Sequence, residues 1–155
     1  MICNASPLIF LAKINQLYLL KKLFSRIYIP NSVKEEILIE EKPGFTVIDK
    51  AIKEGWIKVK DMKKSMNLGL GQGEQDAISL ALELKESLII DDAVGIKVAR
   101  SLNIETFRTT TLILMAVKKK IFTKKQAVEL INKLLNAGYY IAPKYYANLI
   151  TKLSS

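Results

Sequence analysis

Short apolar runs alternate with apolar residues at helical spacing over the first two thirds of the chain. The runs predict strands at 2–4, 27–29, 56–59, 88–91 and 104–107. A helical stripe follows most of them, such as the one that begins at Leu8 and Leu11. This alternation predicts an α/β fold, in which helices pack on both sides of a central, mainly parallel sheet of about five strands.

Several turns and helix starts carry recognisable local signals. Ser6-Pro7 reads as an N-cap followed by proline at the first helical position, and the helix that it starts is expected to break near Asn15. Ser32 and Glu35 fit a capping box for a helix that ends near residue 40. Pro43-Gly44 predicts a turn before a short helix that ends at Gly55.

The remaining elements are expected to be helices joined by polar connections. Residues 62–73 are rich in lysine, serine, asparagine and glycine and predict the least regular stretch. Helices are expected at 74–85 and 93–102, and three more after Phe107, of which the clearest starts at Thr123. Since no internal repeat or long linker interrupts the chain, 1–155 is interpreted as a single domain.

Composition narrows the possible chemistry. The chain has no histidine, which excludes serine–histidine and cysteine–histidine relays and histidine-bound zinc. Its single cysteine, Cys3, lies in an apolar run, is expected to be buried and cannot form an internal disulfide. No apolar run is long enough to span a membrane and the N-terminus lacks a signal-peptide pattern, so a cytoplasmic location is expected.

The charge balance is strongly basic. The formal net charge is +9, from 24 lysines and arginines against 15 acidic residues, and only three of the basic residues are arginines. A basic surface attracts nucleic acid through its phosphates. A lysine-rich composition typical of some thermophiles would give the same balance, so charge alone leaves both interpretations open.

Four oxygen-bearing side chains stand where a strand is expected to lead into a helix: Asn4, Glu36, Glu74 and Asp91. In an open α/β sheet, sites form outside the carboxyl ends of the strands. Oxygen ligands in a chain without histidine suit a hard cation, Mg²⁺ or Mn²⁺. The sequence therefore predicts a divalent-cation site at this edge of the sheet.

Helix geometry separates two of these acids from their neighbours, because successive helical residues turn by about 100°. Glu36 is predicted to border the apolar stripe of its helix, and Glu35 to point the opposite way. Glu74 is predicted to share the apolar face of the next helix, whereas Asp76 is expected to face solvent.

Each of these residues also has a purely structural explanation. Glu74 could complement a helix dipole, and Glu36 could be an exposed helix residue. Either Asp91 or Asp92 could be the N-cap of the following helix, and Asn4 could form an Asx-turn. Residues 69–73 are glycine-rich but lack the remaining features of dinucleotide or P-loop motifs.

Five lysines, at 118–120 and 124–125, lie close together on either side of an expected helix end. Cations at such an end offset the exposed carbonyl groups, and lysines there are usually solvated. Contact with an RNA backbone is the alternative interpretation.

At these positions the chain resembles PIN-domain proteins, in particular a prokaryotic branch often grouped with toxins of toxin–antitoxin pairs. The similar segments follow one another along 1–153: Asn4-Ala5-Ser6-Pro7-Leu8-Ile9, Ile29-Pro30 with Val33-x-x-Glu36-Ile37, Leu70-Gly71-x-Gly73-Glu74-x-x-Ala77-Ile78, Leu88-Ile89-Ile90-Asp91-Asp92 with Lys97-Val98-Ala99-Arg100, and Ala137-Gly138-Tyr139-Tyr140-Ile141.

The resemblance implies a three-layer α/β/α PIN-like fold and a Mg²⁺- or Mn²⁺-dependent endoribonuclease, with RNA as the substrate and a small antitoxin protein or a second copy as possible partners. It implies metal ligands at Asn4, Glu36, Glu74 and Asp91 or Asp92, with Glu36, Glu74 and Asp91 catalytic. Substrate contacts are expected from the following residues: Ser6, Lys97, Arg100, Lys118 and Lys119.

One position departs from the family pattern. Asn4 stands where most nuclease members carry aspartate. The alternative function is therefore a catalytically weak or inactive PIN-fold module that binds RNA or protein.

Overall fold

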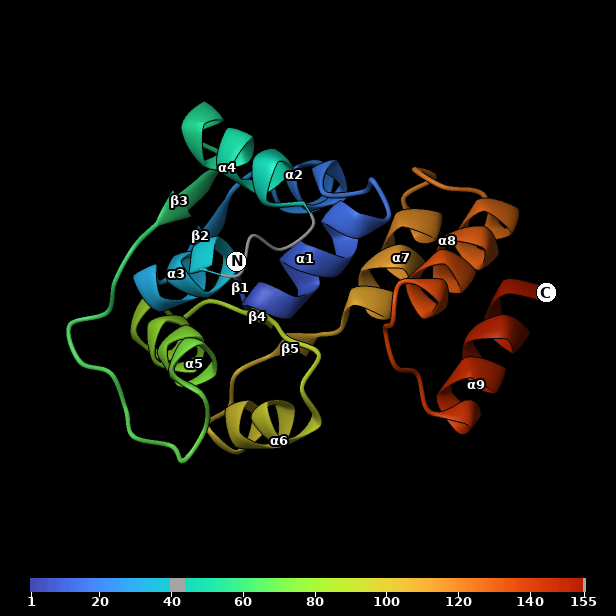
Figure 1. Ribbon diagram of the computed structural model, residues 1–155. Coiled ribbons are helices and arrows are strands. Elements are labelled where there is room, and N and C mark those ends of the chain that lie inside the picture. Colours follow the sequence, from blue (N-terminus) through green and yellow to red (C-terminus); the bar gives the residue numbers. More distant parts are fainter. Residues whose placement is uncertain (40–43, 155) are drawn as a thin grey trace. The chain divides into compact units, whose positions relative to one another are not determined.

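The computed structural model describes residues 1–39 and 44–154 (Figure 1). The chain forms two compact units, Met1–Thr109 and Thr110–Ser155. The first holds a β-sheet with its helices, and the second is helical.

The first unit is built on a five-stranded parallel sheet. Its strands are β1 (Ile2–Cys3), β2 (Ile27–Ile29), β3 (Ile57–Val59), β4 (Leu88–Ile89) and β5 (Thr106–Phe107), in the order β3-β2-β1-β4-β5. Every pairing is parallel, and β1 aligns with β4 through Ile2 opposite Leu88 and Cys3 opposite Ile89. The predicted α/β fold with a parallel sheet of about five strands is confirmed.

Both faces of this sheet are buried. Ile2, Leu88 and Ile90 pack in one core cluster with residues of α5 (Gln72–Leu84) and α6 (Ala93–Ser101). Cys3 and Ile89 alternate with these residues and are also fully buried. Since side chains of a strand point alternately to opposite faces, helices cover the sheet on both sides, as is typical of parallel sheets.

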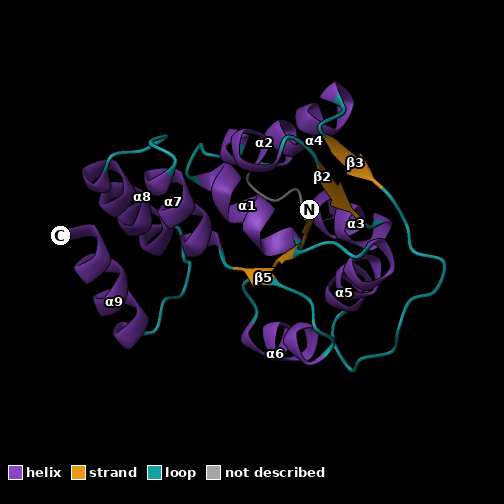
Figure 2. Ribbon diagram, turned by 180° about the vertical axis from the view of Figure 1, so that it is seen from behind, coloured by secondary structure: helices purple, strands orange, loops and turns teal. Residues whose placement is uncertain are grey.

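Four further helices belong to this unit: α1 (Ala5–Lys13), α2 (Tyr18–Phe24), α3 (Asn31–Ile39) and α4 (Phe45–Glu54). Figure 2 shows them in purple around the orange strands. The expected break near Asn15 is confirmed, because Asn15 has a φ of 59° between α1 and α2. The predicted Pro43-Gly44 turn includes Pro43, which lies outside the described residues.

Two helix starts differ from the prediction. Helix α1 begins at Ala5 with Asn4 as its N-cap, so Ser6 lies inside the first turn and Pro7 follows it. Helix α3 begins at Asn31, so Ser32 lies inside the helix and not at its N-cap, and its hydroxyl donates to Asp76 of α5 at 2.6 Å. In both cases the helix begins before the residue that was predicted to cap it.

The second unit contains α7 (Thr109–Lys118) apart from its first residue, α8 (Lys124–Asn136) and α9 (Pro143–Ser154). Helix α8 starts after Thr123, which forms a complete capping box with Gln126. Its buried face is the predicted apolar stripe, which includes Ala127, Ile131 and Leu134. No helix within 1–39 and 44–154 is long and apolar enough to cross a membrane.

Candidate functional site at the carboxyl edge of the sheet

The site is organised by two adjacent parallel strands, β1 and β4. Asn4 directly follows β1, and Asp91 follows β4 after Ile90. The backbone N–H of Asn4 donates to the carbonyl of Ile89 at 3.0 Å, which places Asn4 level with the end of β4. Residues far apart in the sequence therefore meet at one edge of the sheet, as the strand–helix junctions predict.

Asn4 carries a buried acceptor without a partner. The residue is only 4% exposed, and its side-chain Oδ1 has no hydrogen bond within the described structure. Although Asn4 is the N-cap of α1, its side chain does not cap the helix. A buried amide oxygen left unpaired is costly, so an Asx-turn does not explain this residue.

Asp91 is held by the first residue of α7. Its Oδ2 accepts a hydrogen bond from the hydroxyl of Thr109 at 2.6 Å, and its Oδ1 accepts one from the backbone N–H of Thr109 at 2.9 Å. Thr109 is fully buried. The two hydrogen bonds thus fix the orientation of the Asp91 carboxylate at the end of β4.

The charge of Asp91 also reaches Cys3. Burial is the main cause that raises the pKa of the Cys3 thiol, and the neighbouring Asp91 carboxylate raises it further. Cys3 is therefore a buried, protonated thiol at neutral pH, as its apolar context predicts.

Asp92, and not Asp91, caps the helix that follows β4, a role that the sequence left open between the two residues. It is the N-cap of α6, and its Oδ2 accepts a hydrogen bond from the backbone N–H of Gly95 at 2.7 Å. A Cβ atom built on Gly95 would lie 2.7 Å from Cδ1 of Ile90 and 3.3 Å from Oδ2 of Asp92, so a glycine at this position leaves room for both side chains. Asp92 nonetheless lies close enough to Glu74 to help raise the pKa of that carboxyl.

Glu74, in the first turn of α5, feels two neighbouring carboxylates. Partial burial is the largest cause that raises the pKa of Glu74, and the charges of Asp92 and Glu36 raise it further. A hydrogen bond with the backbone of Gly71 acts in the opposite direction. Glu74 on α5 therefore interacts electrostatically with one acid on α3 and with one at the β4–α6 junction.

Glu36 reaches this group across the start of α5. A Cβ atom built on Gly73 would lie 2.8 Å from Oε2 of Glu36, so the carboxylate rests against the α5 backbone. Glu36 as a whole is exposed on α3. Only its carboxylate lies inward, as was expected of the residue, because it contacts α5. Glu35 instead accepts a hydrogen bond from Asn31 of its own helix, at 2.9 Å.

Comparison with known proteins gives a family for this arrangement. The family model described as DUF3368, PIN domain, matches residues 1–155. The chain belongs to the PIN-domain family. A PilT N-terminus domain protein from the hyperthermophilic archaeon Sulfolobus solfataricus P2 has a similar fold, with a TM-score of 0.57 and 23% identity over 76% of this chain and 94% of that chain. The comparison with curated proteins gave no match.

Asp76 corrects one prediction for this PIN domain. It was expected to face solvent, but it is only 7% exposed and accepts hydrogen bonds from Ser32, Ser65 and the side chain of Gln72. Asp76 and Glu83 lie on the same side of α5, as predicted, since both accept hydrogen bonds from the connection that precedes this helix. The outer side of α5 is covered, because the connection that follows β3 packs on it.

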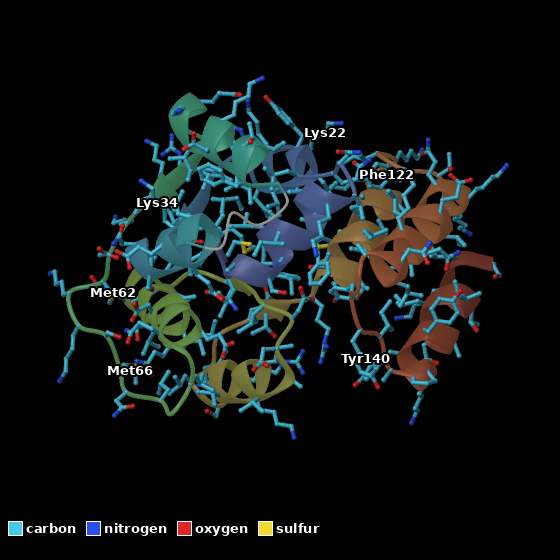
Figure 3. The ribbon with its side chains drawn as sticks, viewed as in Figure 1. Lys22, Lys34, Met62, Met66, Phe122 and Tyr140 are labelled. Atoms are coloured by element: carbon cyan, nitrogen blue, oxygen red, sulfur yellow. The ribbon has the colours of Figure 1, made fainter. Side chains whose placement is uncertain are left out.

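The connection from β3 to α5, residues 60–71, is fastened along α5. The backbone N–H groups of Lys63, Met66 and Leu68 donate to Glu83, Ser79 and Gln75, respectively. Figure 3 labels Met62 and Met66 on this long connection. Side chains of α5 thereby supply the acceptors that an irregular backbone needs.

The predicted substrate residues lie in different places. Ser6 is half-buried in the first turn of α1, beside Asn4. Lys97 is exposed on α6, and Arg100 is near the end of α6 opposite Asp92, where it donates to Thr106 at 3.1 Å. Lys118 and Lys119 belong to the C-terminal unit.

Two residues of the site were missed by sequence reasoning. Thr109 holds Asp91, and Arg108 places a guanidinium nitrogen 3.5 Å from the Asp91 carbonyl oxygen. Both follow β5, so the strand–helix junction rule would have found them had it been applied to the fifth strand as well.

The donor set of this PIN domain fits a hard divalent cation. Asn4 offers an unpaired buried oxygen, Asp91 an oriented carboxylate, and Glu36 and Glu74 carboxylates whose mutual repulsion a cation would relieve. Among the described residues, no three Asp, Glu, His or Cys side chains are gathered closely enough to form a ready-made metal site.

Proposed function

We propose that this PIN-domain protein is a Mg²⁺- or Mn²⁺-dependent endoribonuclease. The observation that carries the proposal is the orphaned Oδ1 of Asn4 beside the end of β4, at the edge of the sheet where Asp91 follows that strand and where Glu74 feels the charges of Glu36 and Asp92. A buried oxygen without a hydrogen bond is rare in native proteins, and a cation bound nearby accounts for it. Membership of the PIN family and the basic net charge of +9 support RNA as the substrate.

Asn4, Glu36, Glu74 and Asp91 would hold the cation, with Asp92 at its margin. When bound, Mg²⁺ or Mn²⁺ would position the scissile phosphate, activate a water and offset charge on the leaving oxygen. Thr109 keeps the Asp91 carboxylate from rotating, as hydrogen-bonded ligands in metal sites commonly are. The raised pKa of Glu74 means that this carboxyl releases its proton less readily until positive charge arrives.

A second function is favoured by Asn4 itself. An amide at this position offers a neutral oxygen and cannot act as a base. The alternative is a PIN-fold module that binds RNA or a protein and cuts RNA slowly or not at all.

The resemblance to toxin components supports a further partner. We propose that a small antitoxin protein restrains the nuclease in the cell. A short open reading frame immediately upstream, whose product binds this chain and blocks cleavage, is the expected finding. Cleavage that is unchanged by that product would remove this part of the proposal.

The test is RNA cleavage by the purified protein. Single-stranded and structured RNAs should be cut with Mn²⁺ or Mg²⁺, and cleavage should stop when EDTA is added. Binding of RNA without any cleavage under all metal conditions would support the binding module instead. Equal cleavage in EDTA would contradict the proposed metal dependence.

A further inference from the structure

The positive charge of the chain is concentrated in its C-terminal unit. Thr110–Ser155 contains eight lysines and a single acidic residue, Glu129, which gives a formal net charge of +7 out of +9 for the whole chain. Met1–Thr109 contains the other 16 basic residues and 14 acidic ones, and is close to neutral. The basic character therefore belongs to one unit.

All eight lysines of the C-terminal unit are exposed. Lys118, Lys119 and Lys120 stand at the end of α7, and Lys124 and Lys125 at the start of α8, so five cations lie within eight residues around one helix–helix connection. Such a concentration of exposed ammonium groups attracts polyanions through its positive potential.

Two exposed tyrosines accompany this charge. Tyr140 is 80% exposed and Tyr145 is 60% exposed, although large aromatic residues are usually well buried. Figure 3 labels Tyr140 on the segment between α8 and α9 and Phe122 on the segment between α7 and α8. Tyr140 and the lysines around the α7–α8 connection lie at opposite ends of α8, so a strand that contacts both would run along this helix. Exposed aromatic rings and basic side chains on one unit are the combination that single-stranded nucleic acids bind, by base stacking and phosphate contacts.

We propose that Thr110–Ser155 is a second RNA-binding element, which grips the substrate backbone through the lysines around the α7–α8 connection and stacks a base on Tyr140. RNA as the ligand rests on the proposed ribonuclease function. The acidic edge of the first unit repels phosphates until a cation is bound, so a separate basic surface lets the protein hold RNA before the cation site is filled.

The experiment measures binding without cleavage. A fluorescent oligouridylate is titrated with the full chain in EDTA, and the salt dependence of the affinity is recorded. Neutralising Lys118, Lys119 and Lys125 together to glutamine should reduce the slope of log affinity against log salt by about 2, at about 0.7 per phosphate contact on a single strand. Tyr140→Ala should lower the affinity about fivefold or more with little change in slope.

The matched control neutralises three exposed lysines of the first unit, Lys22, Lys50 and Lys53, to glutamine. This variant has the same net charge as the test variant and should keep the wild-type slope. An equal loss in both would mean that overall charge, and not this surface, binds RNA, which would overturn the proposal. Circular dichroism spectra of all variants should match the wild type.

A competition arm separates RNA from an acidic protein partner. Polyglutamate that displaces the oligouridylate as well as unlabelled RNA does, at equal charge, would also overturn the proposal. Because every titration is done in EDTA, the outcome is independent of cleavage. A protein that never cuts RNA but loses binding in the test variant would refute only the proposed nuclease function.

Discussion

Thr109 holds both carboxylate oxygens of Asp91, one through its hydroxyl at 2.6 Å and the other through its backbone N–H at 2.9 Å. The contact joins the end of β4 to the start of α7, across 18 residues of sequence. It sets the orientation of one acid of the proposed cation site. Thr109 is therefore expected to matter for cation binding without being a ligand.

Thr109→Val should test this contact, because it keeps the shape of the side chain and removes the hydroxyl. The variant removes the hydroxyl's hydrogen bond to the half-buried Asp91 carboxylate, which should cost about 1–3 kcal/mol of unfolding free energy. Mn²⁺ affinity, measured by calorimetry, should fall as well. Thr109→Ser keeps the hydroxyl and should stay near the wild type in Mn²⁺ affinity; equal affinity in all three proteins would exclude the orienting role.

Glu36 and Glu35 provide a matched pair of neighbouring acids. Glu36→Gln should weaken Mn²⁺ binding, since this carboxylate lies against Gly73 and acts on Glu74. Glu35→Gln removes only a contact with Asn31 and should change stability by no more than about 0.5 kcal/mol, without affecting Mn²⁺. Equal loss of Mn²⁺ affinity in the two variants would show that Glu36 has no special place at the site.

Asn4→Asp should restore a fourth carboxylate. Two carboxylates about 5 Å apart repel by about 3 kcal/mol at an effective dielectric constant of about 20, so the metal-free variant should melt at a lower temperature. Mn²⁺ should bind it more tightly and RNA cleavage should accelerate. Thermal melts with and without Mn²⁺, beside a cleavage assay, measure all three effects. Unchanged affinity and rate would place Asn4 outside the cation site.

Glu74 gives a pH dependence with a defined sign. Its pKa is raised in the folded protein, so between the ordinary glutamate value and the raised one the folded state binds more protons than the unfolded state. In EDTA, stability should therefore fall as pH rises from the ordinary glutamate pKa, about 4.3, through the raised pKa of Glu74, and Glu74→Gln should lessen that fall. Urea unfolding across this range measures it. If the unfolding free energies of the wild type and Glu74→Gln changed with pH in the same way, the raised pKa of Glu74 would be contradicted.

The fold could be predicted because its signals are local. Apolar runs at 27–29 and 88–91 and the helical stripe of α8 correspond to elements of the structure. Period and spacing are sufficient when each strand is short and buried on both faces. Helix starts were predicted less well. Helix α3 begins at Asn31, before the predicted cap Ser32, and no local pattern contains the hydrogen bond that Ser32 donates to Asp76 across 44 residues.

The site could be predicted only where the strand–helix rule was applied. It placed Asn4 and Asp91 at one edge, but the contact between Asp91 and Thr109 depends on the pairing of β4 with β5. Asp76 shows the limit of helix phase. Periodicity identifies which side of α5 a residue is on, but it cannot show that the 60–71 connection covers that side.

The measurement that tests the central claim most directly is the rate of RNA cleavage by the wild type, Glu74→Ala and Asp91→Ala, each with Mn²⁺ and with EDTA. The wild type should cut RNA with Mn²⁺ only, and both variants should remain folded and lose most of that activity. If either variant cuts RNA at the wild-type rate, or EDTA leaves cleavage unchanged, the carboxylates at this edge of the sheet are not the active site.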